Sequence, residues 1–219
     1  MNRNDPTFVR HGVTGRLNHW LTGLCFVLLL LSGLSMFHPL LHWMAGLFGG
    51  GQWARVVHPW IGVVLTVSYL GMIVQYWRDN GWTRDDVAWL RAIGRVLRNS
   101  DDVPEVPRFN AGQKGVFWAM ALLVPALFLS GLAIWHVYFS SYVTIEQQRI
   151  AALIHSLAAL AAIVVWIVHV YAALWVRGSM RAMTRGDVTP GWAWRHHRKW
   201  FRQLAANAAA GRRSGVTGR

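Results

Sequence analysis

The sequence has 219 residues, of which 54% are hydrophobic and 14% charged, and its mean hydropathy is +0.28. This composition argues against an ordinary soluble domain and indicates an integral membrane protein. The net charge of +13 could suggest nucleic-acid binding, but its distribution predicts membrane topology and no nucleic-acid partner. The single cysteine, Cys25, excludes an intramolecular disulfide and a thiolate metal cluster, so metal chemistry has to use histidine.

Four apolar segments, residues 17–37, 56–77, 116–135 and 150–176, predict transmembrane helices. Each is near the roughly 20 residues that a helix needs to cross a hydrocarbon core of about 30 Å. Each also excludes acidic and basic side chains from its interior, where an unpaired charge costs most. The first segment is too long for a typical signal-peptide core, so we expect it to be retained. The sequence therefore predicts an all-α membrane protein, a four-transmembrane-helix bundle, with no internal repeat strong enough to use.

The distribution of basic residues predicts the orientation of these helices. Arginines are frequent between the second and third segments and after the fourth, whereas the other two loops carry almost none. By the positive-inside rule, both termini and the loop 78–112 are cytoplasmic. We expect a cytoplasmic N-terminal segment at residues 1–16 and a membrane domain at 17–177 that includes the loop. A basic cytoplasmic tail follows at 178–219, with its tryptophans at the level of the lipid headgroups.

Four intramembrane histidines are placed to form two pairs. His155 and His169 lie fourteen residues apart in the last segment, a rise of about 21 Å with a change of direction of roughly 40°. One helix face therefore presents an imidazole near each side of the membrane. Helix direction places His58 at the depth of His155, near the outer side, and His19 at the depth of His169, near the cytoplasm. Two imidazoles facing each other across a macrocycle form a six-coordinate haem iron suited to electron transfer.

Zinc binding explains the four paired histidines less well than haem binding does, and surface or interface roles are expected for the other histidines. A zinc site needs more ligands at one depth, and no intramembrane carboxylate or thiolate cluster supplies them. The remaining histidines lack the paired geometry, and we expect them at the interface or the surface. They are His11, His38, His42, His136, His196 and His197.

A compact polar run lies where the cytoplasmic loop enters the third segment, at the depth of His19 and His169. Two interpretations of it stay open. Asn110 could cap the helix, with Gly112 and Gln113 in its first turn. Alternatively, these groups hydrogen-bond a quinone carbonyl where cytoplasmic protons are available. Arg16 and Lys114 could pair with haem propionates or quinol oxygens, or simply reach the interface.

Motifs along most of the chain occur together in one known family. They are His19-Trp20, Leu31-Ser32-Gly33, Val57-His58-Pro59, the run from Asn110 to Lys114 with Phe117-Trp118, Leu153-Ile154-His155, His169 with Tyr171, and Gly178-Ser179-Met180. With these motifs the sequence closely resembles the gamma subunit, the cytochrome b component, of bacterial respiratory formate dehydrogenases. The polar run and the histidine spacing are specific when taken together.

The resemblance implies a multi-pass subunit of the bacterial inner membrane with two haems b as cofactors. Its partners would be an iron–sulfur beta subunit, an alpha subunit with a molybdenum or tungsten pterin, and the surrounding lipid. The chain would be the quinone-reducing electron-transfer subunit and would not oxidise formate itself. It would carry electrons from the iron–sulfur subunit through an outer and an inner haem to menaquinone or ubiquinone on the cytoplasmic side.

By motif match, the resemblance assigns the outer haem to His58 and His155 and the inner haem to His19 and His169. It places Asn110, Gly112 and Gln113 in the quinone pocket. The nearest alternative is the di-haem cytochrome b of a nickel–iron hydrogenase or a related quinone-linked oxidoreductase, from which copurifying subunits would distinguish it. A haem-free transporter whose histidines relay protons is an alternative of a different class.

Overall fold

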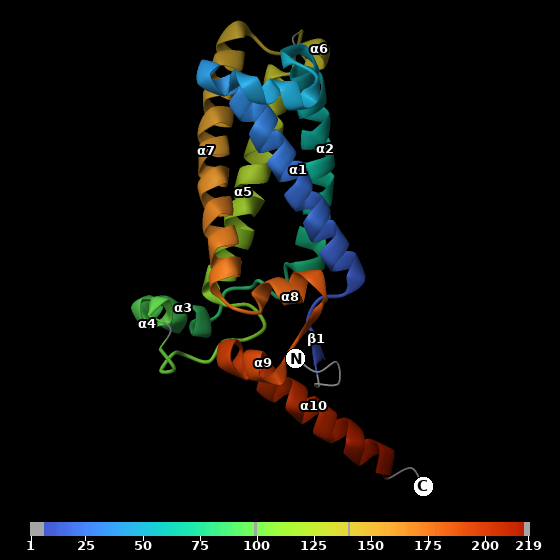
Figure 1. Ribbon diagram of the computed structural model, residues 1–219, viewed down its shortest axis with the longest axis vertical. Coiled ribbons are helices and arrows are strands. Elements are labelled where there is room, and N and C mark those ends of the chain that lie inside the picture. The colour runs from blue at the N-terminus through green and yellow to red at the C-terminus, as the bar shows by residue number, and fades with distance from the viewer. Residues whose placement is uncertain (1–6, 99, 140, 217–219) are drawn as a thin grey trace. The chain divides into compact units, whose positions relative to one another are not determined.

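The computed structural model describes residues 7–98, 100–139 and 141–216 of the chain (Figure 1). The described residues form two compact units. The bundle unit contains residues 13–77 and 116–171. The loop-and-tail unit contains the described residues of 1–12, 78–115 and 172–219.

Four long helices are long and apolar enough to cross a membrane, as the sequence predicts: α1 (Val13–Phe37), α2 (Gly51–Tyr76), α5 (Ala111–Ile134) and α7 (Ile145–Trp175). In lipid, a helix satisfies all its backbone hydrogen bonds internally, which explains why apolar segments of this length become helices. Each helix begins four or five residues before the predicted apolar segment, because helical hydrogen bonding continues into the polar flank. Two short helices lie at the same end of the bundle, η1 (Pro39–Phe48) and α6 (His136–Phe139) (Figure 1).

Inside the bundle, buried apolar and aromatic side chains from all four long helices meet. They include Cys25, Phe26, Leu65, Tyr69, Val124 and Ala162. Polar side chains also join helices: Asn18 of α1 donates to the backbone oxygen of Ser68 of α2 at 2.9 Å. The Tyr69 hydroxyl of α2 donates to the backbone oxygen of Phe117 of α5 at 2.6 Å. Large apolar side chains such as Leu122, which is 74% exposed, cover the surface of these helices, as a lipid-facing surface requires.

The loop-and-tail unit joins segments that are far apart in the sequence. Strands β1 (Phe8–Val9) and β2 (Asp187–Val188) pair antiparallel, with Phe8 opposite Val188. The loop forms α3 (Arg84–Arg91) and α4 (Ile93–Leu97), and the tail forms α8 (Ser179–Thr184), α9 (Pro190–His196) and α10 (Arg198–Val216). A small core of Val188, Ala193 and Trp200 holds the tail elements together.

At the centre of this unit Arg10 and His197 hold three segments together. His197 donates through Nδ1 to the backbone oxygen of Pro107 at 2.8 Å, so its Nε2 accepts from the Arg10 guanidinium at 3.2 Å. Arg10 also donates to the backbone oxygen of Arg108 at 2.7 Å. Burial, and then the charge of Arg108, lower the pKa of Arg10 to about 9, while burial and Arg10 hold the pKa of His197 well below its ordinary value. The prediction of a surface or interface role is wrong for His197 and for His11, which are 1% and 8% exposed.

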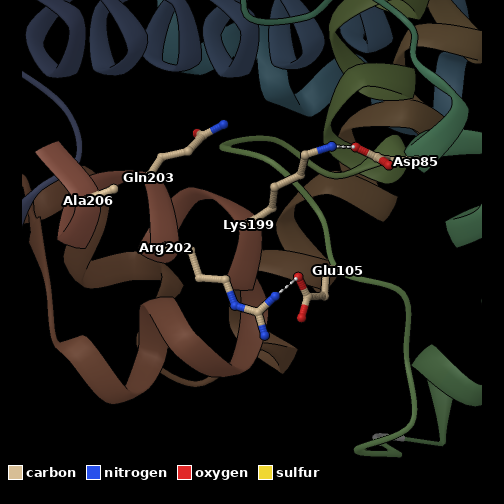
Figure 2. Close-up of a pocket in the computed structure, with 6 residues that line it drawn as sticks. All are labelled: Asp85, Glu105, Lys199, Arg202, Gln203 and Ala206. Atoms are coloured by element: carbon tan, nitrogen blue, oxygen red, sulfur yellow. Dashed lines mark hydrogen bonds and ion pairs between the residues drawn. The ribbon is translucent and has the colours of Figure 1, made fainter.

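Ion pairs fasten α10 to the loop (Figure 2). Lys199 lies 2.6 Å from Asp85, and Arg202 lies 2.8 Å from Glu105. These pairs border a shallow pocket on the surface of the unit. Because their side chains are partly exposed to solvent, such pairs contribute little stability, and they mainly fix the position of the helix.

Candidate functional site

The structure brings the four intramembrane histidines together in the two pairs that helix direction predicts. The ring centres of His19 on α1 and His169 on α7 lie 6.0 Å apart. Those of His58 on α2 and His155 on α7 lie 6.3 Å apart. Both pairs lie in the bundle unit, and the His58 pair lies toward the end that carries η1 and α6.

These separations fit a metal held between two imidazoles. Nitrogens bound at about 2 Å to opposite faces of one metal place their ring centres about 6 Å apart. Among the described residues, no group of three or more His, Cys, Asp or Glu side chains gathers in a way that could hold a metal ion. The geometry therefore suits a two-ligand site such as haem iron, whose other four ligands come from the porphyrin.

A serine on α1 fixes which nitrogen of His58 carries its proton. The Ser32 hydroxyl donates to the backbone oxygen of Leu28 at 2.8 Å, so its oxygen accepts from His58 Nδ1 at 2.7 Å. His58 Nδ1 therefore carries the hydrogen, and Nε2 keeps the lone pair that a metal needs.

The same arrangement recurs on α5 and α7. The Ser130 hydroxyl donates to the backbone oxygen of Ala126 at 2.6 Å, and His155 Nδ1 lies 3.1 Å from the Ser130 oxygen. His155 Nδ1 also donates to the backbone oxygen of Leu127 at 3.0 Å. A carbonyl oxygen can only accept, so His155 Nδ1 carries the hydrogen and its Nε2 also has a free lone pair.

A glycine follows each serine and gives the imidazole room. A Cβ atom at Gly33 would come within 3.4 Å of His58 Cε1, and one at Gly131 within 3.4 Å of His155 Cε1. Neither serine is among the site residues predicted from the sequence, and no repeat was predicted. The signal was present: Leu-Ser-Gly-Leu occurs at residues 31–34 and again at 129–132, each time 25 or 26 residues before a paired histidine when counted from the serine.

The polar run at the start of α5 forms a helix cap. The Asn110 side-chain oxygen accepts from the backbone N–H of Gln113 at 3.0 Å, and the Gln113 side-chain oxygen accepts from the backbone N–H of Asn110 at 3.1 Å. This reciprocal pair is a capping box, so the capping interpretation of Asn110 is correct as geometry. A Cβ atom at Gly112 would approach the Trp89 ring of α3 to 3.2 Å, so a glycine permits this contact.

Lys114, next in the run, has a structural partner in the loop. Its ammonium lies 2.7 Å from Asp86 Oδ2 and donates to the backbone oxygen of Gly81 at 2.8 Å. Burial would raise the pKa of Asp86, but hydrogen bonds from Lys114 and Thr83 outweigh it and hold that pKa below its ordinary value. Lys114 is 1% exposed, so this ion pair, rather than a haem propionate or the interface, occupies its side chain.

Comparison with known proteins identifies the family of this chain. The family of prokaryotic cytochrome b561 matches residues 10–186, which include both histidine pairs and the cap. The chain belongs to this family. The family is one of membrane haem b proteins that carry electrons, which agrees with the sequence prediction of a cytochrome b in transmembrane helices.

Curated members with clear similarity are cytochrome b556 subunits of formate dehydrogenases. The Fdo subunit of Escherichia coli K12 is 43% identical over 93% of this chain and 96% of its own length. The nitrate-inducible Fdn subunit of the same strain is 36% identical over 90% and 91%, respectively. The subunit of Haemophilus influenzae is 34% identical over 91% and 84%. These relatives confirm the predicted resemblance to the cytochrome b subunits of formate dehydrogenases.

Proposed function

We propose that this chain is the cytochrome b subunit of a bacterial formate dehydrogenase and carries electrons across the inner membrane to a quinone. The observation that carries the proposal is the two opposed imidazole pairs, with ring centres 6.0 and 6.3 Å apart. Haem b held between two imidazoles would supply reversible one-electron transfer and would leave no site on the iron for other chemistry. The relatives named as formate dehydrogenase subunits support the choice of electron donor.

The residues of the bundle would hold two haems b. His58 and His155 would bind one iron, and His19 and His169 the other. With both termini cytoplasmic, as the basic loop and tail predict, the His58 pair is the outer site and the His19 pair the inner one. Electrons from an iron–sulfur beta subunit, fed by an alpha subunit with a molybdenum or tungsten pterin, would enter at the outer site.

The quinone site would lie at the start of α5. The cap uses the side-chain oxygens of Asn110 and Gln113 and leaves both side-chain NH₂ groups outside it. These NH₂ groups and the first N–H groups of α5, including that of Gly112, are donors at the positive end of the helix dipole. They suit a quinone carbonyl that gains negative charge, while its two protons come from the cytoplasm.

Single histidine variants of the purified complex test the proposal. His58→Ala should lose the outer haem and keep the inner one, while His19→Ala should do the reverse. The b-type absorbance of each variant counts the haems that remain, and the position of the reduced band and the midpoint potential identify them. Loss of the same haem in both variants would refute the pairing. Copurification of the chain with a nickel–iron enzyme instead of a pterin subunit would favour the hydrogenase alternative.

A further inference from the structure

Both ligands of one pair are hydrogen-bonded to serines, and this arrangement differs from that of the other pair. His58 Nδ1 lies 2.7 Å from Ser32 Oγ, and His155 Nδ1 lies 3.1 Å from Ser130 Oγ. Both serines are buried, at 0% and 7% exposed. By contrast, His19 Nδ1 is buried and has no hydrogen-bond partner among the residues that the structure describes.

We propose that Ser32 and Ser130 are positioning residues that hold both ligands of the His58–His155 haem in the iron-binding tautomer and lower its reduction potential below that of the second haem. The inference rests on the proposed function, because it requires haem iron between the two imidazoles. It adds what that function leaves open, namely the order of the two potentials and the residues that set it.

The physical reason lies in the proton on Nδ1. Each serine hydroxyl is committed as a donor to a backbone oxygen of its own helix, Leu28 for Ser32 and Ala126 for Ser130. Each serine oxygen is therefore fixed as an acceptor for Nδ1–H. An acceptor at this position raises the basicity of an imidazole ligand and so its electron donation to the metal. Stronger donation stabilises ferric over ferrous iron, which lowers the potential.

The asymmetry between the pairs gives the potentials an order. Two serine-bonded imidazoles make the His58–His155 haem the weaker electron acceptor. The His19–His169 haem, in which the Nδ1 of one ligand lacks such a partner among the described residues, is the stronger acceptor. Electrons move spontaneously toward the higher potential, so this order drives them from the proposed outer site to the inner site and its quinone.

The two serines should contribute unequally. Ser32 gives the shorter contact, and no second partner of His58 Nδ1 is found in the described part of the chain. His155 Nδ1 has the backbone oxygen of Leu127 as a second acceptor at 3.0 Å. Removing Ser130 therefore leaves the tautomer of His155 in place, whereas removing Ser32 leaves His58 without its acceptor.

The chain offers a matched control at Ser35. This serine is buried one turn from Ser32 and donates to the backbone oxygen of Ser32 at 2.7 Å. The corresponding position in the second Leu-Ser-Gly-Leu segment is Ala133, so the chain itself accommodates alanine there. Ser35→Ala removes a similar hydroxyl from the same helix without touching an Nδ1 contact.

Redox titration of the purified holocomplex, monitored by the reduced b-type absorbance, tests the proposal. In the wild type we expect two components, and in the His19→Ala variant we expect only the lower-potential one. Ser130→Ala should raise the potential of that lower component, Ser32→Ala should raise it more, and the double variant most. Ser35→Ala should leave both components unchanged, and Ser32→Thr, which keeps a hydroxyl, should return the component toward its wild-type value.

The other outcomes of this experiment either support the proposal or overturn it. If Ser32→Ala loses one haem and Ser32→Thr restores it, the hydroxyl holds the ligating tautomer and the proposal is supported. Unshifted potentials in Ser130→Ala with two haems bound, a shift in the higher-potential component, or an equal shift in Ser35→Ala would overturn it. Such results would leave the proposed function intact, since that function requires haem at both histidine pairs but no particular order of their potentials.

Discussion

At the scale of single residues, Asn110 and Gln113 each have a structural role and a proposed functional role, and different atoms of the side chain serve the two. Their side-chain oxygens form the cap of α5, and their NH₂ groups would bind quinone. The sequence left these two interpretations as alternatives. The structure shows that the cap does not use the amide nitrogens, so the two roles are compatible.

Variants that preserve the cap distinguish the structural role from the proposed functional role. Asn110→Ser and Gln113→Glu preserve an oxygen for the cap but remove the NH₂ donors, as in the Ser-x-x-Glu capping box. We expect slower quinone reduction, with both haems and the thermal stability unchanged. Asn110→Ala should slow reduction as well and in addition cost about 1 kcal/mol of stability from the lost cap. The rate of steady-state quinone reduction and the thermal unfolding of each variant measure the two effects. Unchanged turnover in both cap-preserving variants would show that the polar run serves only as a helix cap.

The histidine pairs could be predicted from sequence, whereas the repeated Leu-Ser-Gly-Leu segments mark the two serines without showing which side chains they contact. Helix direction and a rise of 1.5 Å per residue determine the depth of each histidine, and depth alone sets the pairs. The contact of Ser32 with His58 depends also on how α1 and α2 rotate against each other, which apolar segments hardly specify. The hydroxyl and the imidazole therefore meet only in the folded bundle.

At the scale of elements, the tail makes contacts that its prediction did not include. The position of its tryptophans at the lipid headgroups stays a prediction, but Trp200 is 8% exposed and lies in the core of the loop-and-tail unit. The Arg10 guanidinium lies 4.9 Å from the ring centre of Trp192 and 5.1 Å from that of Trp200. These contacts join residues more than 180 positions apart in the sequence, which no local pattern predicts. The loop itself contains two short helices, α3 and α4, which meet at Ala92.

The loop-and-tail unit should loosen in acid because of His197. Its folded-state pKa lies below 6.5, so on acidification the unfolded chain takes up the proton first, and stability falls as the pH drops below about 6.5. A protonated His197 could no longer accept from Arg10. Limited proteolysis of the purified protein between pH 8 and pH 5.5 should therefore speed up at the tail on acidification.

The variant His197→Gln tests whether protonation of His197 causes the loosening in acid. It offers an amide donor and acceptor that do not titrate, so the acid-dependent increase in cleavage should largely disappear. His196→Gln, at the neighbouring half-buried position, should retain most of the increase. An acid response as large in His197→Gln as in the wild type would assign the effect to other groups, such as His11.

At the scale of the whole molecule, the membrane bundle was the most predictable part. Lipid forces each spanning segment to satisfy its own backbone, so hydropathy and length suffice to find the four helices. The orientation of these helices stays a prediction that rests on the basic loop and tail. The α7 helix alone carries one member of each histidine pair, and the fourteen-position spacing of His155 and His169 separates the two proposed haems along the membrane normal.

The haem content of the purified full-length chain tests the central claim most directly. The absorbance spectrum of the dithionite-reduced protein shows the haem type, and extracted haem counted against protein gives the stoichiometry. Two opposed imidazole pairs predict b-type bands and two haems per chain. A spectrum without b-type bands, or a stoichiometry of one haem or none in a folded chain, would contradict the account.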